Sequence, residues 1–130
     1  MRISHQKALE HAKRAVYECS FEIIKASEKK DKKALSGNTS EYPKKVTMLA
    51  ISYHNLGVEE DYCGNFENAR EAYYKAYEMM ERANGPDDPL TKKFRRSYIE
   101  EKNVTLRYLQ LSDFIRKLKS QAEGTSRLPL

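Results

Sequence analysis

The sequence of 130 residues contains no tryptophan, two cysteines, four prolines and five glycines. So few glycines and prolines favour long helices. The isolated Cys19 and Cys63 fit neither a disulfide framework nor a metal-binding spacing.

No uncharged apolar run approaches the roughly 20 residues that a membrane-spanning helix needs. The first residues also lack the apolar core of a secretory signal. We therefore expect a cytoplasmic protein.

Charge is what the sequence has in abundance. Charged residues make up 33% of the chain and hydrophobic residues 39%, a mixture that favours long solvated helices. The net charge of +5 is unevenly spread: residues 1–42 carry +3, residues 43–90 carry −4 and residues 91–130 carry +6. An acidic middle between basic ends bears on the choice of partner and not on the fold.

Apolar residues recur at intervals of three and four, which predicts helices over about 4–33, 44–63, 66–83 and 90–122. Loop-forming residues fill 34–43, Gly64-Asn65 gives a tight turn, and the Gly and Pro residues of 85–89 stop the third helix. No strand-like alternation persists. We expect one all-α domain over 1–123, followed by a flexible tail at 124–130.

The second and third predicted helices form a hairpin in which small residues oppose bulky ones. Gly57 and three alanines would let the two backbones approach closely. Here the sequence resembles the tetratricopeptide repeat family, with its aromatic residue, Leu-Gly, second aromatic, spaced alanines and closing proline. The residues that carry the resemblance are Tyr53, Leu56, Gly57, Gly64, Phe66, Ala69, Tyr73, Ala76 and Pro89.

A finer resemblance is to the kinesin-light-chain-like subgroup of this family. The stretch His54-Asn55-Leu56-Gly57 looks like its Asn-Asn-Leu-Ala, and residues 85–89 look like its Gly-x-Asp-His-Pro linker. The resemblance implies an antiparallel helical hairpin as a central repeat at about 46–89. The helix at 4–33 would then belong to a partial preceding repeat, and the helix at 90–122 would cap the stack. Glu60 stands where the family prefers an aromatic residue.

Proteins of this family bind an extended peptide or a helix on a concave surface lined by the first helices of successive repeats. The resemblance therefore implies a scaffold or adaptor that binds a partner protein. Asn55 matches a groove asparagine, whose carboxamide both donates and accepts hydrogen bonds. The residues expected on this surface are Ile51, His54, Asn55, Val58, Asp61 and Tyr62, with Lys93 and Arg96 of the last helix beside them.

Two alternatives stay open. Five residues of the last helix have the four-three-four-three spacing of a coiled coil, so this helix could self-associate or join a cytoskeletal or ciliary assembly. The simpler use of that stripe is to cover the hairpin. The basic cluster 92–96 could contact nucleic-acid phosphates, although Phe94 fits the core stripe. The five spaced residues are Val104, Tyr108, Leu111, Ile115 and Leu118.

Signals of catalysis are missing. The sequence has no glycine-rich phosphate loop, nucleophile motif or paired-carboxylate arrangement. His5, His11 and His54 lie on separate stretches and do not suggest a metal site. We therefore expect no enzymatic activity, cofactor, metal ion or small-molecule substrate, and no membrane partner.

Overall fold

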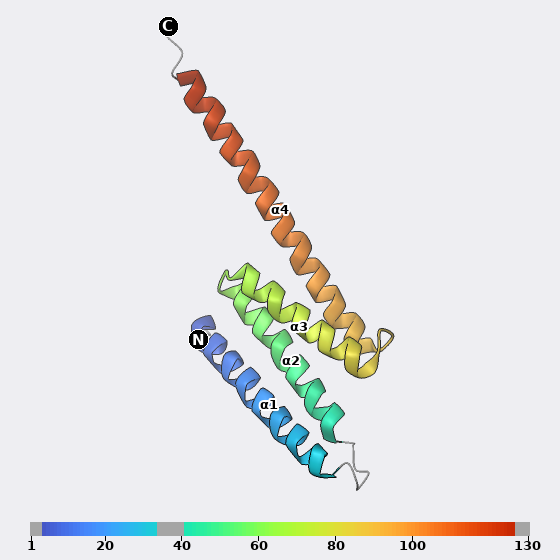
Figure 1. Cartoon of the computed structure of the whole chain (residues 1–130). Coiled ribbons are helices and arrows are strands. Elements are labelled where there is room, and N and C mark those ends of the chain that lie inside the picture. The colour runs from blue at the N-terminus through green and yellow to red at the C-terminus, as the bar shows by residue number, and fades with distance from the viewer. Residues whose placement is uncertain (1–3, 34–40, 127–130) are drawn as a thin grey trace.

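The computed structural model describes residues 4–33 and 41–126, which form four α-helices and no strand. The helices are α1 (His5–Lys33), α2 (Glu41–Tyr62), α3 (Phe66–Asn84) and α4 (Pro89–Ser126). Each helix packs against the next one in the sequence and runs in the opposite direction to it (Figure 1). The prediction of an all-α fold built around an antiparallel helical hairpin is confirmed.

The helix ends differ by a few residues from the expected ones. α2 begins at Glu41, so Pro43 lies in its first turn, where backbone N–H groups have no partner within the helix. Most of the expected loop at 34–43 lies outside the described residues. α4 continues to Ser126 and thus enters the segment 124–130 that was expected to be flexible. Residues 127–130 lie outside the described part.

Glycines and an aspartate fix the two described turns. Gly64 has φ of 79° and Gly85 has φ of 87°, values in the left-handed region that glycine adopts without strain. The carboxylate oxygen Oδ1 of Asp88 accepts hydrogen bonds from the backbone N–H groups of Leu90 (2.9 Å) and Thr91 (3.3 Å). Asp88 therefore caps the N-terminus of α4, and Pro89 occupies its first position.

Glu60 has a structural role at the hairpin turn. Its side chain is buried, with 3% of its surface exposed. Asn65 donates to Glu60 twice, from its side-chain amide to Oε2 and from its backbone N–H to the carbonyl oxygen, each at 2.8 Å. The buried carboxylate thus ties the turn to the end of α2, which explains why a charged residue occupies a position where an aromatic was expected.

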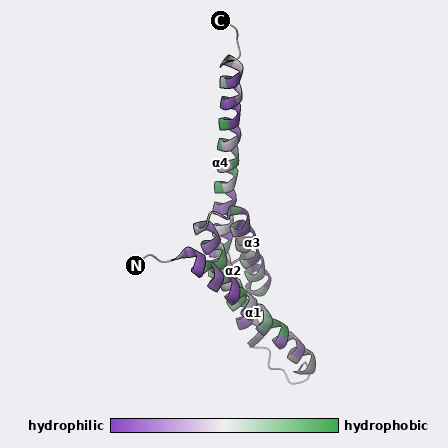
Figure 2. Cartoon of the chain, turned by 90° about the vertical axis from the view of Figure 1, so that its left-hand side faces the viewer, coloured by the Kyte–Doolittle hydropathy of each residue, from purple (hydrophilic) through white to green (hydrophobic). Residues whose placement is uncertain are grey.

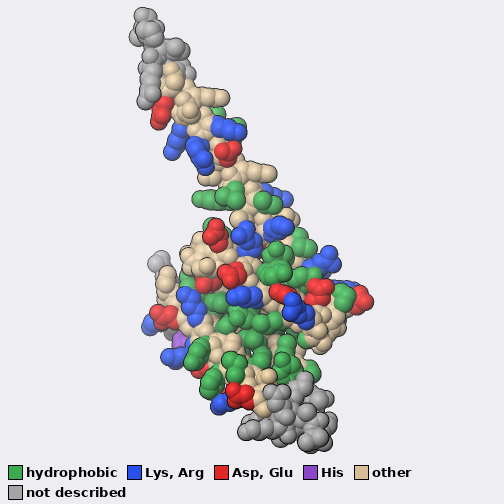
Figure 3. Space-filling view, in the orientation of Figure 1, with side chains coloured by type: hydrophobic (Ala, Val, Ile, Leu, Met, Phe, Trp, Pro, Cys, Tyr) green, Lys and Arg blue, Asp and Glu red, His purple; other side chains and the backbone are tan. Residues whose placement is uncertain are grey.

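The core lies between α2, α3 and the start of α4. Its buried members are Ala50, Ala76, Met80 and Phe94. Gly57 is buried beside them and faces the ring of Tyr73, so the small-against-large packing expected for the hairpin is confirmed. Hydrophobic side chains gather over the bundle in the space-filling view, with both signs of charge around them (Figure 3).

The second half of α4 does not cover the hairpin, so that part of the sequence prediction is wrong. From position 106 to 124 every side chain except that of Ser112 is exposed. The helix leaves the bundle and continues alone, carrying hydrophobic and hydrophilic residues (Figures 1 and 2). The stripe residues Val104, Tyr108, Leu111, Ile115 and Leu118 are 44–60% exposed. The sequence prediction placed these residues on the bundle because their spacing marks an apolar side of the helix. Spacing does not show how far the neighbouring helices extend.

Replacing Gly57 with alanine tests the contact between α2 and α3. A Cβ atom at position 57 would lie 2.7 Å from Cδ1 and Cε1 of Tyr73, a ring that is buried and hydrogen-bonded to Asp61. We expect Gly57→Ala to lower the free energy of unfolding by about 1–2 kcal/mol, because overpacking outweighs the gain in helix propensity. Urea denaturation followed by circular dichroism measures the change.

Gly124→Ala is the matched control. Position 124 also lies in a helix, but nothing lies within 4 Å of a Cβ atom there. We expect this variant to be as stable as the wild type or slightly more stable. If Gly57→Ala behaves in the same way, the close approach of the two helices is not what stabilises the hairpin.

Candidate protein-binding site

The residues expected to bind a partner belong to α2 and to the first half of α4. We call the side of the bundle on which these two helices meet, at His54, Phe94 and Ser97, the α2–α4 face. Of the residues expected to bind, Asn55, Tyr62, Lys93 and Arg96 are exposed. Ile51 is half-buried and packs against the core cluster, so it contributes to packing. The exposed groups among the predicted residues are therefore one carboxamide, one tyrosine ring and two cations.

His54 links α2 to α4. Its ring stacks on that of Phe94, with centroids 4.6 Å apart and an interplanar angle of 14°, and its Nε2 is hydrogen-bonded to Oγ of Ser97 at 3.1 Å. Burial, and secondarily the positive charge of Lys93, lowers the pKa of His54. The neutral imidazole thus contributes to the contact between α2 and α4.

A hollow of about 380 Å³ lies further along the same face. It is lined by Val58, Asp61, Tyr62 and Tyr73, of which the first three were expected on the binding surface. The hydroxyl of Tyr73 donates to Oδ2 of Asp61 at 3.2 Å, and burial followed by the charge of Asp61 raises the pKa of Tyr73 well above its usual range. Tyr62 is exposed and stacks on His5, with centroids 4.4 Å apart.

A pair of carboxyl groups, Asp61 on α2 and Glu101 on α4, lies beneath this face. Glu101 is only 7% exposed. Burial, then a hydrogen bond to Asp61 and its negative charge, raises the pKa of Glu101 to about 7, and Arg70 acts in the opposite direction. With both groups ionised, neither Oδ1 of Asp61 nor Oε1 of Glu101 has a donor within the described part of the chain. When Glu101 is protonated, its carboxyl group can donate a hydrogen bond to Asp61. Sequence reasoning missed this pair because its members are 40 positions apart.

The basic cluster 92–96 does not present its aromatic ring. Phe94 is 2% exposed and belongs to the core, as its place in the apolar stripe predicted. Its ring is therefore not available to stack on a nucleobase. Within the described ranges no group of His, Cys, Asp or Glu side chains is arranged to hold a metal ion.

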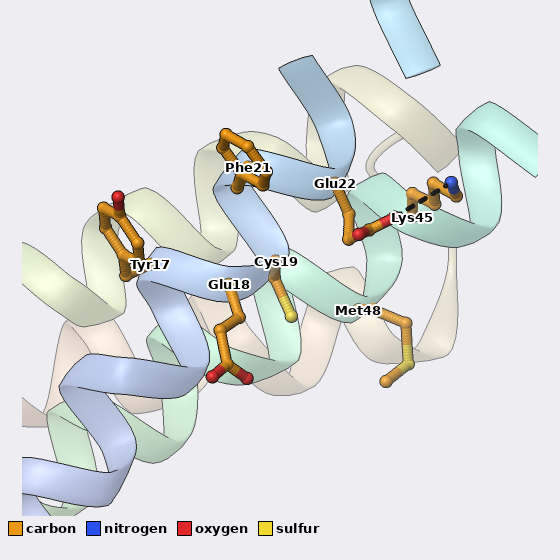
Figure 4. Close-up of a pocket in the computed structure, with 7 residues that line it drawn as sticks. All are labelled: Tyr17, Glu18, Cys19, Phe21, Glu22, Lys45 and Met48. Carbon is orange, nitrogen blue, oxygen red and sulfur yellow. Dashed lines mark ion pairs between the residues drawn. The ribbon is translucent and has the colours of Figure 1, made fainter. Parts of the chain in front are cut away.

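A second hollow, of about 480 Å³, lies between α1 and α2 on the outer side of the bundle (Figure 4). Tyr17 and Phe21 project from α1 on one side of it, and Met48 lies on α2. At its edge Lys45 pairs with Glu22 at 3.5 Å. The sequence analysis did not single out this region, although Tyr17, Phe21 and Ile24 recur with helical spacing on a side of α1 that is not needed for packing on α2.

Comparison with known families agrees with the hairpin geometry. Residues 49–90 match the tetratricopeptide repeat family. The matched segment begins within α2, includes all of α3 and ends at the second residue of α4. The match supports a tetratricopeptide-repeat protein, a class whose members generally bind other proteins. No curated protein and no solved structure matches the chain significantly. No helix among the described residues is long and apolar enough to cross a membrane.

The carboxyl pair predicts a pH-dependent stability. Because the pKa of Glu101 is raised in the folded protein, its protonated form favours folding. This contribution is complete below the pKa of an unfolded glutamate and is lost as the pH rises to about 7. We expect Glu101→Gln to match the wild type near pH 5 and to exceed its free energy of unfolding near pH 8 by about 1–3 kcal/mol. Urea titrations at the two pH values measure the difference.

Glu100→Gln is the matched control, since Glu100 is an exposed neighbour on the same helix. It removes the same charge and should keep the pH dependence of the wild type. If wild type and Glu101→Gln lose stability in parallel between the two pH values, Glu101 is not the group that titrates in this range.

Proposed function

We propose that this protein is a scaffold or adaptor that binds a segment of a partner protein on its α2–α4 face. The observation that carries the proposal is the match of residues 49–90 to the tetratricopeptide repeat. The exposed Asn55 and the adjoining hollow lie at α2, the first helix of the matched repeat, and the exposed Lys93 and Arg96 lie on α4, which follows that repeat as the first helix of a next repeat would. By the kinesin-light-chain-like resemblance, Asn55 holds the backbone of the bound segment.

The chemistry of the face indicates what the segment contains. The carboxamide of Asn55 can pair with a peptide group, since it both donates and accepts hydrogen bonds. Lys93 and Arg96 carry positive charge that favours an acidic segment, and the hollow at Val58 and Tyr62 accepts an apolar side chain. The ligand on this proposal is an extended peptide with acidic residues and one apolar anchor.

A comparative pull-down from the source cell's lysate tests the proposal. Wild-type protein is compared with an Asn55→Ala, Lys93→Ala, Arg96→Ala variant whose fold is confirmed by circular dichroism. We expect the variant to lose the bound partner. With a peptide from that partner, we expect at least a tenfold weaker affinity, because a hydrogen bond and two charge contacts are removed.

A second triple variant is the matched control. Asn68→Ala, Lys92→Ala, Arg95→Ala removes the same three residue types, and all six residues are exposed. The control loses the same charge and two members of the basic cluster 92–96. It should retain the partner. If both variants lose it equally, binding follows net charge or the basic cluster, and the α2–α4 face is not the site.

A second candidate function is structural. The exposed apolar stripe on the second half of α4 favours it, because soluble proteins seldom leave several large apolar side chains in a row uncovered. On this alternative, α4 joins the protein to an assembly through a helix–helix contact.

A further inference from the structure

α4 carries one continuous seam along most of its length, polar at Ser97 and Glu101 and mostly apolar beyond them. Its first members face α2: Phe94 stacks on His54, Ser97 bonds to His54, and Glu101 lies beside Asp61. Beyond them the same alternation of three and four residues continues without a break, as in a heptad repeat. The α4 seam comprises Phe94, Ser97, Glu101, Val104, Tyr108, Leu111, Ile115, Leu118 and Ala122.

The α4 seam continues beyond the end of α2, the helix that covers its first residues. α2 stops at Tyr62, and the last ring contact of the seam with the bundle joins Tyr108 to Phe66, with centroids 6.2 Å apart. Leu111, Ile115 and Leu118 are 57%, 44% and 48% exposed. A solitary helical extension of this length is marginal in water and gains most of its stability from a packed apolar face. An occupant of the seam is therefore expected to be another helix.

We propose that the occupant is the same part of α4 from a second copy of this chain, packed antiparallel. This inference rests on the second candidate function and is independent of the α2–α4 face. With Leu111 opposite Ile115, the seam pairs with itself under two-fold symmetry. Tyr108 then lies opposite Leu118, and Val104 opposite Ala122. A two-fold contact of this kind closes on itself and gives a dimer.

The bundle selects the antiparallel direction. In a parallel pair, the early seam positions Phe94 and Ser97 of both copies would have to meet, but α2 already occupies them. In the antiparallel register, Ser126 of one copy lies opposite residue 100 of the other, so only the last two helical residues of the copy, 125 and 126, reach the part of the seam that α2 covers. The two bundles then lie at opposite ends of the pair.

Charge is compatible with this pairing. Lys117 forms an ion pair with Asp113 of its own helix at 3.3 Å, which partly neutralises the outer side of the segment. Beside the seam, Arg107 and Lys119 lie on opposite edges of the helix. The antiparallel register brings Arg107 level with Lys119 of the copy but on the other edge of the pair, so these two like charges do not face each other.

Sedimentation equilibrium from about 1 µM to about 500 µM tests the dimer, since dimerisation depends on concentration. We expect the wild type to pass from monomer to dimer in this range. Leu111→Gln, Leu118→Gln should weaken the dimer at least tenfold, because it removes apolar contacts while glutamine keeps good helix propensity. Helix content is checked by circular dichroism. A wild type that stays monomeric throughout would overturn the proposal.

Leu106→Gln, Leu109→Gln is the matched control. These leucines are 48% and 56% exposed, against 57% and 48% for Leu111 and Leu118, but they lie outside the seam. The control should dimerise like the wild type. Equal weakening by both variants would mean that association follows general hydrophobicity, which contradicts a seam.

Cysteine cross-linking tests the direction in a background with Cys19→Ala and Cys63→Ala, which should itself sediment as the wild type. Antiparallel pairing predicts a disulfide in a mixture of Val104→Cys and Ala122→Cys chains, and little in either variant alone. Cross-linking of each variant with itself would indicate a parallel pair and overturn the register. The triple variant of Asn55, Lys93 and Arg96 should still dimerise, so loss of partner binding and loss of the dimer are separate outcomes.

Discussion

The ring of Tyr73 lies against the backbone of Gly57, and the rest of the bundle depends on this contact. Because no Cβ atom separates them, α3 approaches α2 closely enough for the Tyr73 hydroxyl to reach Asp61 and for its ring to lie 5.3 Å from that of His54. The ring of His54 in turn stacks on that of Phe94. The start of α4 is thereby positioned through two aromatic contacts that begin at a single glycine.

Much of the polar chemistry on the α2–α4 face serves the fold. His54 and Asp61, which the family resemblance assigns to ligand binding, contact Ser97 and Tyr73 within the chain. Asn55, Lys93 and Arg96 are exposed on this face, while His54 and Asp61 are bonded to other side chains of the bundle. The division follows from burial: polar groups that are shielded from water need partners inside the protein, and exposed ones remain available.

Local patterns predicted the fold better than the site. Helical spacing, Gly64, Gly85 and the proline at the start of α4 mark elements that depend on near neighbours in the sequence, and the helices lie close to where these signals placed them. The pairing of Asp61 with Glu101 and the stacking of His54 on Phe94 depend on how two helices are rotated about their axes. The exposure of Leu111 depends on where α2 and α3 end in space. Periodicity in one sequence carries neither kind of information.

The uninterrupted course of α4 has a mechanical consequence. Asp88 and Pro89 fix where the helix starts, and neither glycine nor proline breaks it between Leu90 and Glu123. From Phe94 to Ser126 such a rod measures about 48 Å at 1.5 Å per residue. A tilt of about 10° at the Phe94 seat would therefore carry its free end through about 8 Å. A small change of packing around His54 or Glu101 would thus produce a much larger displacement at the end of α4 that lies far from the bundle.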